Sequence, residues 1–241
     1  MRISGDRVNR PPKLQALVAD RLQQMVLDGS WRRGTKLPAE RLLCEQLGVS
    51  RTVLRESISI LRARGVLKDV PGKGTFVWQN VTEPLKELLS LFVSSNKLDG
   101  SVQLFEVRTL LEVEIAGLAA ERASPSDIAE LEKINDGLGR MNRIVGPWTE
   151  DRVRRYNDQD FDFHLKLAKC TKNELFAVLL TALTGSFLDS WDHLHNQPET
   201  RRQGIQMHER ILKAVRAKDP RAARKATRNN LKAFLKASLK E

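Results

Sequence analysis

The chain has few of the residues that mark secreted and membrane proteins. Its only two cysteines, Cys44 and Cys170, lie far apart in apolar, helix-like patterns. Such a pair indicates buried reduced thiols rather than a disulfide framework. No apolar run approaches the roughly 20 residues that a membrane helix needs, and the first residues lack the apolar core of a signal peptide. We therefore expect a cytoplasmic protein that has no membrane partner.

Signatures of catalysis are also scarce. No candidate serine nucleophile, Cys/His dyad or glycine-rich phosphate loop stands beside the candidate metal-binding residues described below, and the sequence has 4 histidines. These absences argue against an enzyme. With 241 residues the chain can form two compact domains, each with a core of its own.

Positive charge is concentrated in the first third of the chain. Residues 1–80 hold 15 Lys and Arg against 7 Asp and Glu (+8), whereas residues 81–241 hold 26 against 23 (+3). A basic surplus on one module is what neutralisation of DNA phosphates requires. Residues 213–241 carry a second surplus, 10 basic against 2 acidic residues, which leaves residues 81–212 at −5. This second run is either another phosphate-facing surface or, as is more common, a solvated helix face.

Residues 14–64 have the pattern of three helices that end in a helix-turn-helix. Apolar residues recur at helical spacing in residues 14–29, and a second helix is predicted from Pro38, a residue suited to the first helical position. Gly48 and Ser50 then predict a sharp turn and a cap for a third helix, residues 51–64. Arg51, Thr52 and Arg55 lie outside the apolar stripe of that helix. Its first turns are where such proteins contact base edges, often through arginine.

A short hairpin follows this helix. Residues 66–70 and 75–78 have strand propensity, and Pro71-Gly-Lys-Gly74 joins them. A lysine between glycines lets the backbone approach a phosphate or the minor groove. Each of these features is common in proteins that do not bind DNA. Together they predict a winged helix-turn-helix DNA-binding domain over residues 1–80, with residues 1–12 as a flexible arm.

The rest of the chain, residues 81–241, has only helical periodicity. Helices are predicted at residues 85–93, 104–122, 126–141, 156–170, 173–194, 204–217 and 220–240. The predicted fold class is therefore mainly α: a winged helix-turn-helix of three helices plus a small β-hairpin, followed by an all-α bundle of six or seven helices.

One group of residues in the predicted bundle has metal-ligand chemistry. Asp160 and His164 are four residues apart, so they share a helix face and can bind one ion. His208, on a later helix, is a third candidate, whereas His193 and His195 lie near the end of another helix. Spacing alone leaves open that these residues are ordinary helix surface.

The motifs resemble a known family. Leu37-Pro-Ala-Glu-Arg41, Leu47-Gly-Val-Ser-Arg51-Thr-Val-Leu-Arg55 and Pro71-Gly-Lys-Gly-Thr-Phe-Val77 closely resemble the winged-helix domain of GntR-type bacterial transcription regulators. The second half resembles the FCD effector domain of the FadR subfamily, through Leu104-Phe-Glu-Val-Arg108-Thr-Leu-Leu-Glu112, Asp160-Phe-Asp-Phe-His164, Asn173 and residues 208–219. The resemblance covers nearly the whole chain from about residue 12.

The resemblance implies a dimeric repressor, or less often an activator, that binds a palindromic double-stranded DNA operator and responds to a small organic acid. The DNA-binding residues that it implies are Arg41, Ser50, Arg51, Thr52, Arg55, Gly72, Lys73 and Gly74. The arginines could equally act as phosphate clamps. Two other classes of function remain open: an architectural DNA-binding protein without an effector, and a metal-dependent enzyme fused to a DNA-binding module.

The resemblance also implies a divalent metal, zinc or nickel-like, held by one Asp and three His. Asp160, His164 and His208 match three of these ligands, and Asn230 stands where the family has its fourth, a histidine. An amide oxygen is a weaker ligand for zinc-like ions, so we expect a weaker site or one completed by effector and water. Arg108 matches an inward arginine that can form a forked pair with an effector carboxylate. The alternative for Arg108 is a surface salt bridge with Glu112, one turn on.

Overall fold

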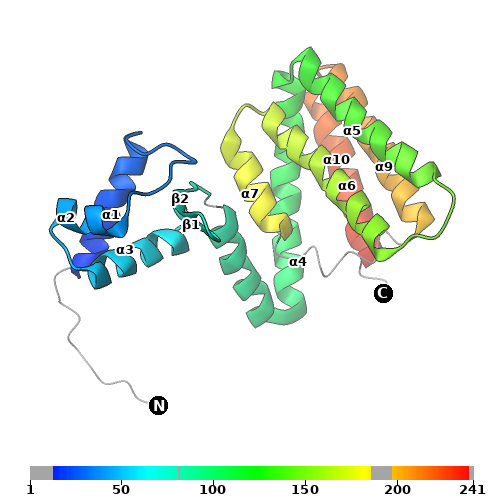
Figure 1. Ribbon diagram of the computed structural model, residues 1–241. Helices are drawn as coiled ribbons and strands as arrows, with labels where there is room; N and C mark the ends of the chain where they lie inside the picture. The colour runs from blue at the N-terminus through cyan, green and yellow to red at the C-terminus, as the bar shows by residue number, and fades with distance from the viewer. Residues whose placement is uncertain (1–12, 81, 186–196, 239–241) are drawn as a thin grey trace, which may run out of the picture. The chain divides into compact units, whose positions relative to one another are not determined.

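The computed structural model describes residues 13–80, 82–185 and 197–238, without the side chains of residues 96–101 and 232–238. The chain forms two compact units, residues 1–84 and 85–241 (Figure 1). The predicted arm, residues 1–12, and His193 and His195 lie outside the described residues. Among the helices that are described, none combines the length and apolar character needed to cross a membrane.

The first unit is a winged helix-turn-helix. It contains α1 (Leu14–Leu27), α2 (Glu40–Leu47), α3 (Arg51–Ala63), β1 (Leu67–Val70) and β2 (Gly74–Val77). The strands pair antiparallel, from Leu67 opposite Val77 to Val70 opposite Gly74. Every element contributes to one apolar core, which includes Leu22, Leu43, Leu54, Leu67 and Val77. The predicted three helices and hairpin are confirmed.

The start of α2 differs from the prediction. Pro38 does not occupy the first helical position, because α2 begins at Glu40 with Ala39 as its N-cap. The reason lies in the preceding residues, since Lys36 bridges to Phe76 and the Leu37 amide donates to the Thr75 carbonyl at 2.8 Å. Pairing with β2 keeps the chain extended up to the helix.

Two glycines define the ends of α2 and α3. Gly48 takes the left-handed conformation (φ 64°) that ends α2, and the Ser50 hydroxyl then accepts a hydrogen bond from the Val53 amide at 3.3 Å. Gly65 follows α3 with φ 71°, and a Cβ there would lie 2.0 Å from the Asn80 carbonyl oxygen. Only glycine fits at position 65, because both the backbone conformation and the nearby Asn80 carbonyl exclude a side chain.

The second unit is an all-α bundle. Its described helices are α4 (Thr82–Arg122), α5 (Pro125–Arg143), α6 (Glu150–Cys170), α7 (Glu174–Gly185), α9 (Pro198–Arg216) and α10 (Pro220–Ser238). The helices predicted at residues 85–93 and 104–122 are a single element, α4, which Figure 1 draws as two arms meeting at a bend. A small apolar cluster joins both arms to α7: Leu89, Val93, Leu104, Leu111 and Leu183.

The main core lies between these helices. It includes Ile115 and Ala119 of α4, Phe163 and Leu167 of α6, Leu180 of α7, Ile211 and Val215 of α9 and Ala223 of α10. Alanines at positions 116, 119, 120 and 123 belong to the same core.

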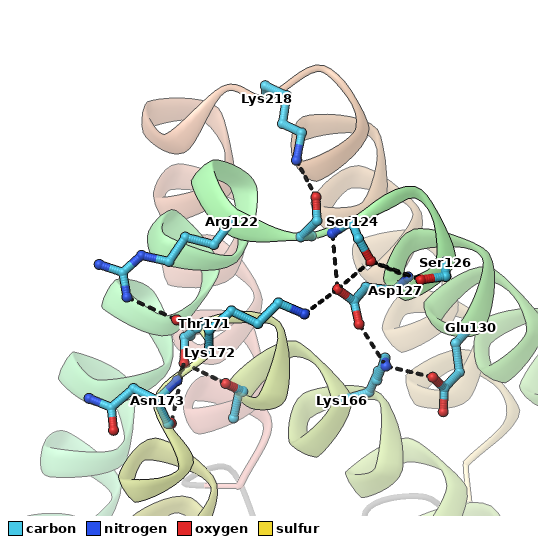
Figure 2. A network of polar contacts seen from close by, with 12 residues as sticks. Arg122, Ser124, Ser126, Asp127, Glu130, Lys166, Thr171, Lys172, Asn173 and Lys218 are labelled. Carbon is cyan, nitrogen blue, oxygen red and sulfur yellow. Dashed lines mark hydrogen bonds and ion pairs between the residues drawn. The ribbon is translucent and has the colours of Figure 1, made fainter.

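A polar network closes one end of this bundle (Figure 2). Ser124 and Asp127 form a capping box at the start of α5. The Asp127 carboxylate also accepts from Lys172 at 2.6 Å and from Lys166 of α6 at 3.0 Å. The hydrogen bond from Lys172 is the main reason why the pKa of Asp127 is held well below its usual range. Asp127 therefore ties the start of α5 to the end of α6.

Candidate DNA-binding surface and effector site

The residues expected to contact DNA are all exposed: Arg41, Ser50, Arg51, Thr52, Arg55, Gly72, Lys73 and Gly74. α3 buries Leu54, Ile58 and Leu61 in the core, so its polar first turns are available to a partner. The hairpin tip is fixed by a 2.9 Å hydrogen bond from the Lys73 amide to the Val70 carbonyl. The Ser50 hydroxyl serves as the α3 cap, and contact of any of these residues with DNA stays a prediction.

Two of the candidate arginines have carboxylate partners that the sequence analysis did not anticipate. The Arg55 Nε donates to both oxygens of Glu40, at 3.0 and 3.2 Å, across the helix pair. Arg41 donates to Glu45 at 2.7 Å within α2. A guanidinium has five N–H donors, so each arginine keeps donors for a base or a phosphate.

The candidate metal ligands converge inside the second unit. Asp160 and His164 project from α6 and His208 from α9, and their ligand atoms all lie within 4.8 Å of one another. The two histidine Nε2 atoms are 3.3 Å apart. The Asp160 carboxylate oxygens lie 3.7 Å from His208 Nε2 and 4.0 Å from His164 Nε2. Both histidines are buried, at 4% and 1% exposure, so the alternative that they are ordinary helix surface is wrong.

These distances fit a divalent metal. Two nitrogens that bind one tetrahedral zinc at about 2.0–2.1 Å are separated by about 3.3 Å. The histidine nitrogens already have this separation, and the Asp160 carboxylate oxygens lie 3.7 and 4.0 Å from them. Asn230 lies half-buried on α10, which packs along α9. It stays a predicted fourth ligand.

Arg108 and Glu112 of α4 extend this site. Arg108 Nε donates to Glu112 Oε1, and Glu112 Oε2 lies 2.6 Å from His164 Nδ1. The expected alternative for Arg108, a salt bridge with Glu112, is correct in its partners but wrong in its surface location. Arg108 is 8% and Glu112 2% exposed, because the α4 face that carries them turns toward the bundle core.

The charges in this cluster support one another. Burial disfavours the Glu112 carboxylate, but Arg108 and His164 outweigh that effect and lower the pKa of Glu112 to about 2. Burial likewise disfavours a charged His164, yet the carboxylates of Glu112 and Asp160 hold the pKa of its imidazole above the usual value. The opposite charges of these α4 and α6 side chains thus offset part of the cost of burying them.

Two residues of the site went unassigned in the sequence analysis. Phe163 stacks on the ring of His208, a candidate ligand, with centroids 3.9 Å apart and planes 14° from parallel. Glu112 was considered only as a partner of Arg108. Its four-residue spacing from Arg108 was visible in the sequence, whereas its contact with His164, 52 positions further on, depends on how α4 packs on α6.

Comparison with known proteins identifies the family. Residues 14–77 match the bacterial regulatory proteins of the gntR family, and residues 103–233 match the FCD domain. The chain belongs to the GntR family. This confirms the resemblance drawn from its motifs and makes the protein a DNA-binding regulator with an FCD effector domain.

Individual relatives agree with this assignment. The Glc operon transcriptional activator of Escherichia coli is 29% identical over 91% of this chain and 87% of its own length. The regulator LutR of Bacillus subtilis is 33% identical over 80% of this chain and 86% of its own. The solved structure of a Streptococcus agalactiae GntR protein, 29% identical, covers 90% of this chain and 97% of its own with a TM-score of 0.69. These relatives are regulators, which confirms that this GntR-family chain is not an enzyme.

Proposed function

We propose that this GntR-family protein is a cytoplasmic, ligand-responsive repressor. It binds a palindromic operator as a homodimer and releases it when a small organic acid, assisted by a divalent metal, enters the FCD domain. A two-fold protein matches a two-fold operator, because each copy presents the same recognition helix to one half-site. Membership of the FadR subfamily belongs to the same proposal.

The buried cluster of Asp160, His164 and His208 carries this proposal. Placing polar and charged groups in a helical core costs several kcal/mol unless they are paired or bind a ligand, on the order of 2–7 kcal/mol for a single unsatisfied group. An architectural protein would gain nothing from such a core. A sensor needs one, because its pocket must recognise a charged ligand.

The chemistry of the cluster suits a carboxylate. Asp160, His164 and His208 would hold a zinc or nickel-like ion, with Asn230 or water completing the set. When bound, such an ion supplies positive charge that attracts an organic acid. Arg108 adds a guanidinium on the neighbouring helix, one whose Nε is already engaged by Glu112. An acid at Arg108 would therefore use the other donors of that guanidinium.

A thermal-shift experiment separates the proposed sensor from an architectural protein. Metal-free protein is heated alone, with zinc, and with zinc plus L-lactate, glycolate or citrate. Binding to the folded state raises the melting temperature through mass action. We expect zinc to raise it and at least one acid to raise it further, with the zinc effect lost in His164→Ala. No shift with any metal or acid contradicts the sensor.

Transcription from the operator in vitro tests the sign of regulation. A repressor lowers transcription from an adjacent promoter, and addition of the active acid restores it. The Glc operon relative is an activator by name, so a rise in transcription on adding this protein would replace the repressor proposal by an activator.

A further inference from the structure

Glu112 lies between the candidate acid-binding arginine and a candidate metal-binding histidine. Its Oε1 accepts from Arg108 Nε, and its Oε2 lies 2.6 Å from His164 Nδ1. The side chain is 2% exposed, so solvent hardly competes for either oxygen. A single carboxylate of α4 is thus shared by the two functional halves of the effector site.

We propose that Glu112 is a positioning residue that prepares His164 for metal binding, an inference that rests on the proposed metal site. A neutral imidazole carries one N–H, and the nitrogen that faces an acceptor holds it. The 2.6 Å separation of Glu112 Oε2 and His164 Nδ1 favours the tautomer whose proton is on Nδ1, which leaves the Nε2 lone pair for the ion. A carboxylate behind a histidine also makes it a stronger ligand.

The position of His164 Nε2 agrees with this role. It lies 3.3 Å from His208 Nε2 and 4.0 Å from the Asp160 carboxylate, so the nitrogen left without the proton is the one that faces the other ligands. Arg108 holds the carboxylate from its other side. α4 therefore contributes no metal ligand of its own to this cluster, yet it determines how a ligand of α6 is oriented.

A purely structural role for Glu112 makes a different prediction. If Glu112 served only as the counter-ion of buried Arg108, its replacement would lower stability but leave the tautomer of His164 unchanged. Zinc affinity would then stay the same in every variant that folds. Tautomer and zinc affinity are therefore the informative measurements.

The test uses full-length, metal-free protein titrated with zinc in competition with a chelator. We expect Glu112→Gln to weaken zinc binding about 10- to 100-fold, the range typical for loss of a carboxylate behind a metal-binding histidine. The matched control is Glu106→Gln, which removes the same charge from an exposed position of α4. That control should bind zinc within about twofold of the unaltered protein, as expected for a distant, solvent-screened charge. The ¹⁵N shifts of the His164 ring, measured without zinc at a pH high enough for the ring to be neutral, should show the proton on Nδ1 in the unaltered protein and a changed pattern in Glu112→Gln.

A double variant separates the loss of the Glu112 carboxylate from the misfolding that a buried Arg108 beside a neutral side chain could cause. Arg108→Gln combined with Glu112→Gln removes both charges, so no guanidinium is left beside a missing carboxylate, and it should show the same loss of zinc affinity. Unchanged zinc affinity in the folded variants overturns the role of Glu112 and leaves the metal site standing. No saturable zinc binding by the unaltered protein overturns the metal site and this inference together.

Discussion

Glu40 is an acidic residue that contacts Arg55, one of the candidate DNA-contacting arginines. It sits in the first turn of α2, where the helix dipole favours a carboxylate, and both of its oxygens accept from Arg55 Nε. A carboxylate there repels DNA, which lowers affinity for every sequence. It also restrains the Arg55 guanidinium, so that the Nη edge remains for a base. Glu40 is therefore expected to lower the affinity for all DNA and to raise the preference for the operator over other sequences.

Replacing Glu40 tests this expectation. Glu40→Gln should bind random-sequence DNA more tightly and should lower the ratio of operator to random affinity by about fivefold, because a well-held arginine contributes roughly 1–3 kcal/mol of base discrimination and part of that is lost. Fluorescence anisotropy with operator and scrambled duplexes at one salt concentration measures both quantities.

Glu56→Gln is the matched control for Glu40. It removes the same charge from an exposed residue of α3 that neighbours Arg55 in sequence. It should change affinity for both duplexes alike and leave their ratio unchanged. Equal loss of discrimination in the two variants would mean that charge alone, and not the Glu40–Arg55 pair, is responsible.

At the scale of elements, the tip of the hairpin is predicted to contact a DNA phosphate. The Lys73 side chain is exposed at its tip, whereas the Lys68 ammonium of β1 lies 4.5 Å from the centre of the Trp78 ring. Lys73→Ala should weaken binding to all sequences and reduce the slope of log affinity against log salt by about 0.9, the value for one phosphate contact. Lys68→Ala should leave that slope unchanged. A salt titration of both variants measures these slopes. Identical slopes for Lys73→Ala and the unaltered protein would show that the hairpin tip does not contact DNA.

The Asp127 junction should contribute measurably to the stability of the bundle. Asp127→Asn loses the charge that Lys166 and Lys172 contact, and charge-assisted hydrogen bonds contribute about 1.5–3 kcal/mol. We expect a loss of about 2 kcal/mol in the free energy of unfolding at pH 7, measured by urea denaturation. Glu130→Gln, which removes a 58% exposed partner of Lys166, should cost less than about 0.5 kcal/mol.

The stability difference between the unaltered protein and Asp127→Asn should depend on pH. The pKa of Asp127 is lowered in the folded protein, so its contribution is fully present above the unfolded pKa of about 3.9 and is lost as the pH falls below that value. The difference between the unaltered protein and Asp127→Asn should therefore shrink between pH 5 and pH 3. A difference that stays constant over this range would contradict the role given to the Asp127 charge.

The predicted and observed helices differ in ways that show which features local sequence patterns determine. Glycine, serine and apolar spacing located α3 because its start and end are local: Gly48, Ser50 and Gly65 act within a few residues. The continuity of α4 was missed, because residues 94–103 lack the apolar spacing on which the prediction relied. The start of α6 was also missed. Thr149 caps that helix and Arg152 donates to the Met141 carbonyl at 2.8 Å, a contact with the end of α5 that periodicity does not contain.

The same distinction applies to the candidate site. Asp160 and His164 could be paired from spacing, since one helix turn separates them, and His208 was a third candidate that the family resemblance then matched to a ligand position. The burial of Glu112 and its contact with His164 could not be predicted, because they depend on which face of α4 meets α6. The contacts of Glu40 with Arg55 and of Glu112 with His164 are therefore the part that required the structure.

For the whole molecule, the proposed switch requires a homodimer. The chain has a mass of 27.3 kDa, so sedimentation equilibrium of the free protein should give a species of twice that mass. The operator should then bind one dimer, and a duplex with a single half-site should bind much more weakly, because the second half-site adds its contacts without a second association step. A monomer that binds single half-sites and palindromes equally would contradict the dimer.

Acid and operator must then influence each other by the same factor. A ligand shifts an equilibrium only through different affinities for its two states, and the coupling between two ligands is reciprocal. If the active acid weakens operator binding by a given factor, operator DNA must weaken acid binding by that factor; typical couplings are about 5- to 150-fold. Calorimetric titration of zinc-loaded protein with the acid, with and without saturating operator, measures the change in acid affinity. Anisotropy with and without saturating acid measures the change in operator affinity.

Glu40→Gln should change operator affinity yet leave the coupling factor intact, since Glu40 belongs to the DNA-binding unit. Two factors that disagree, or an acid that binds without any coupling, would show that the effector pocket does not control the DNA-binding domain.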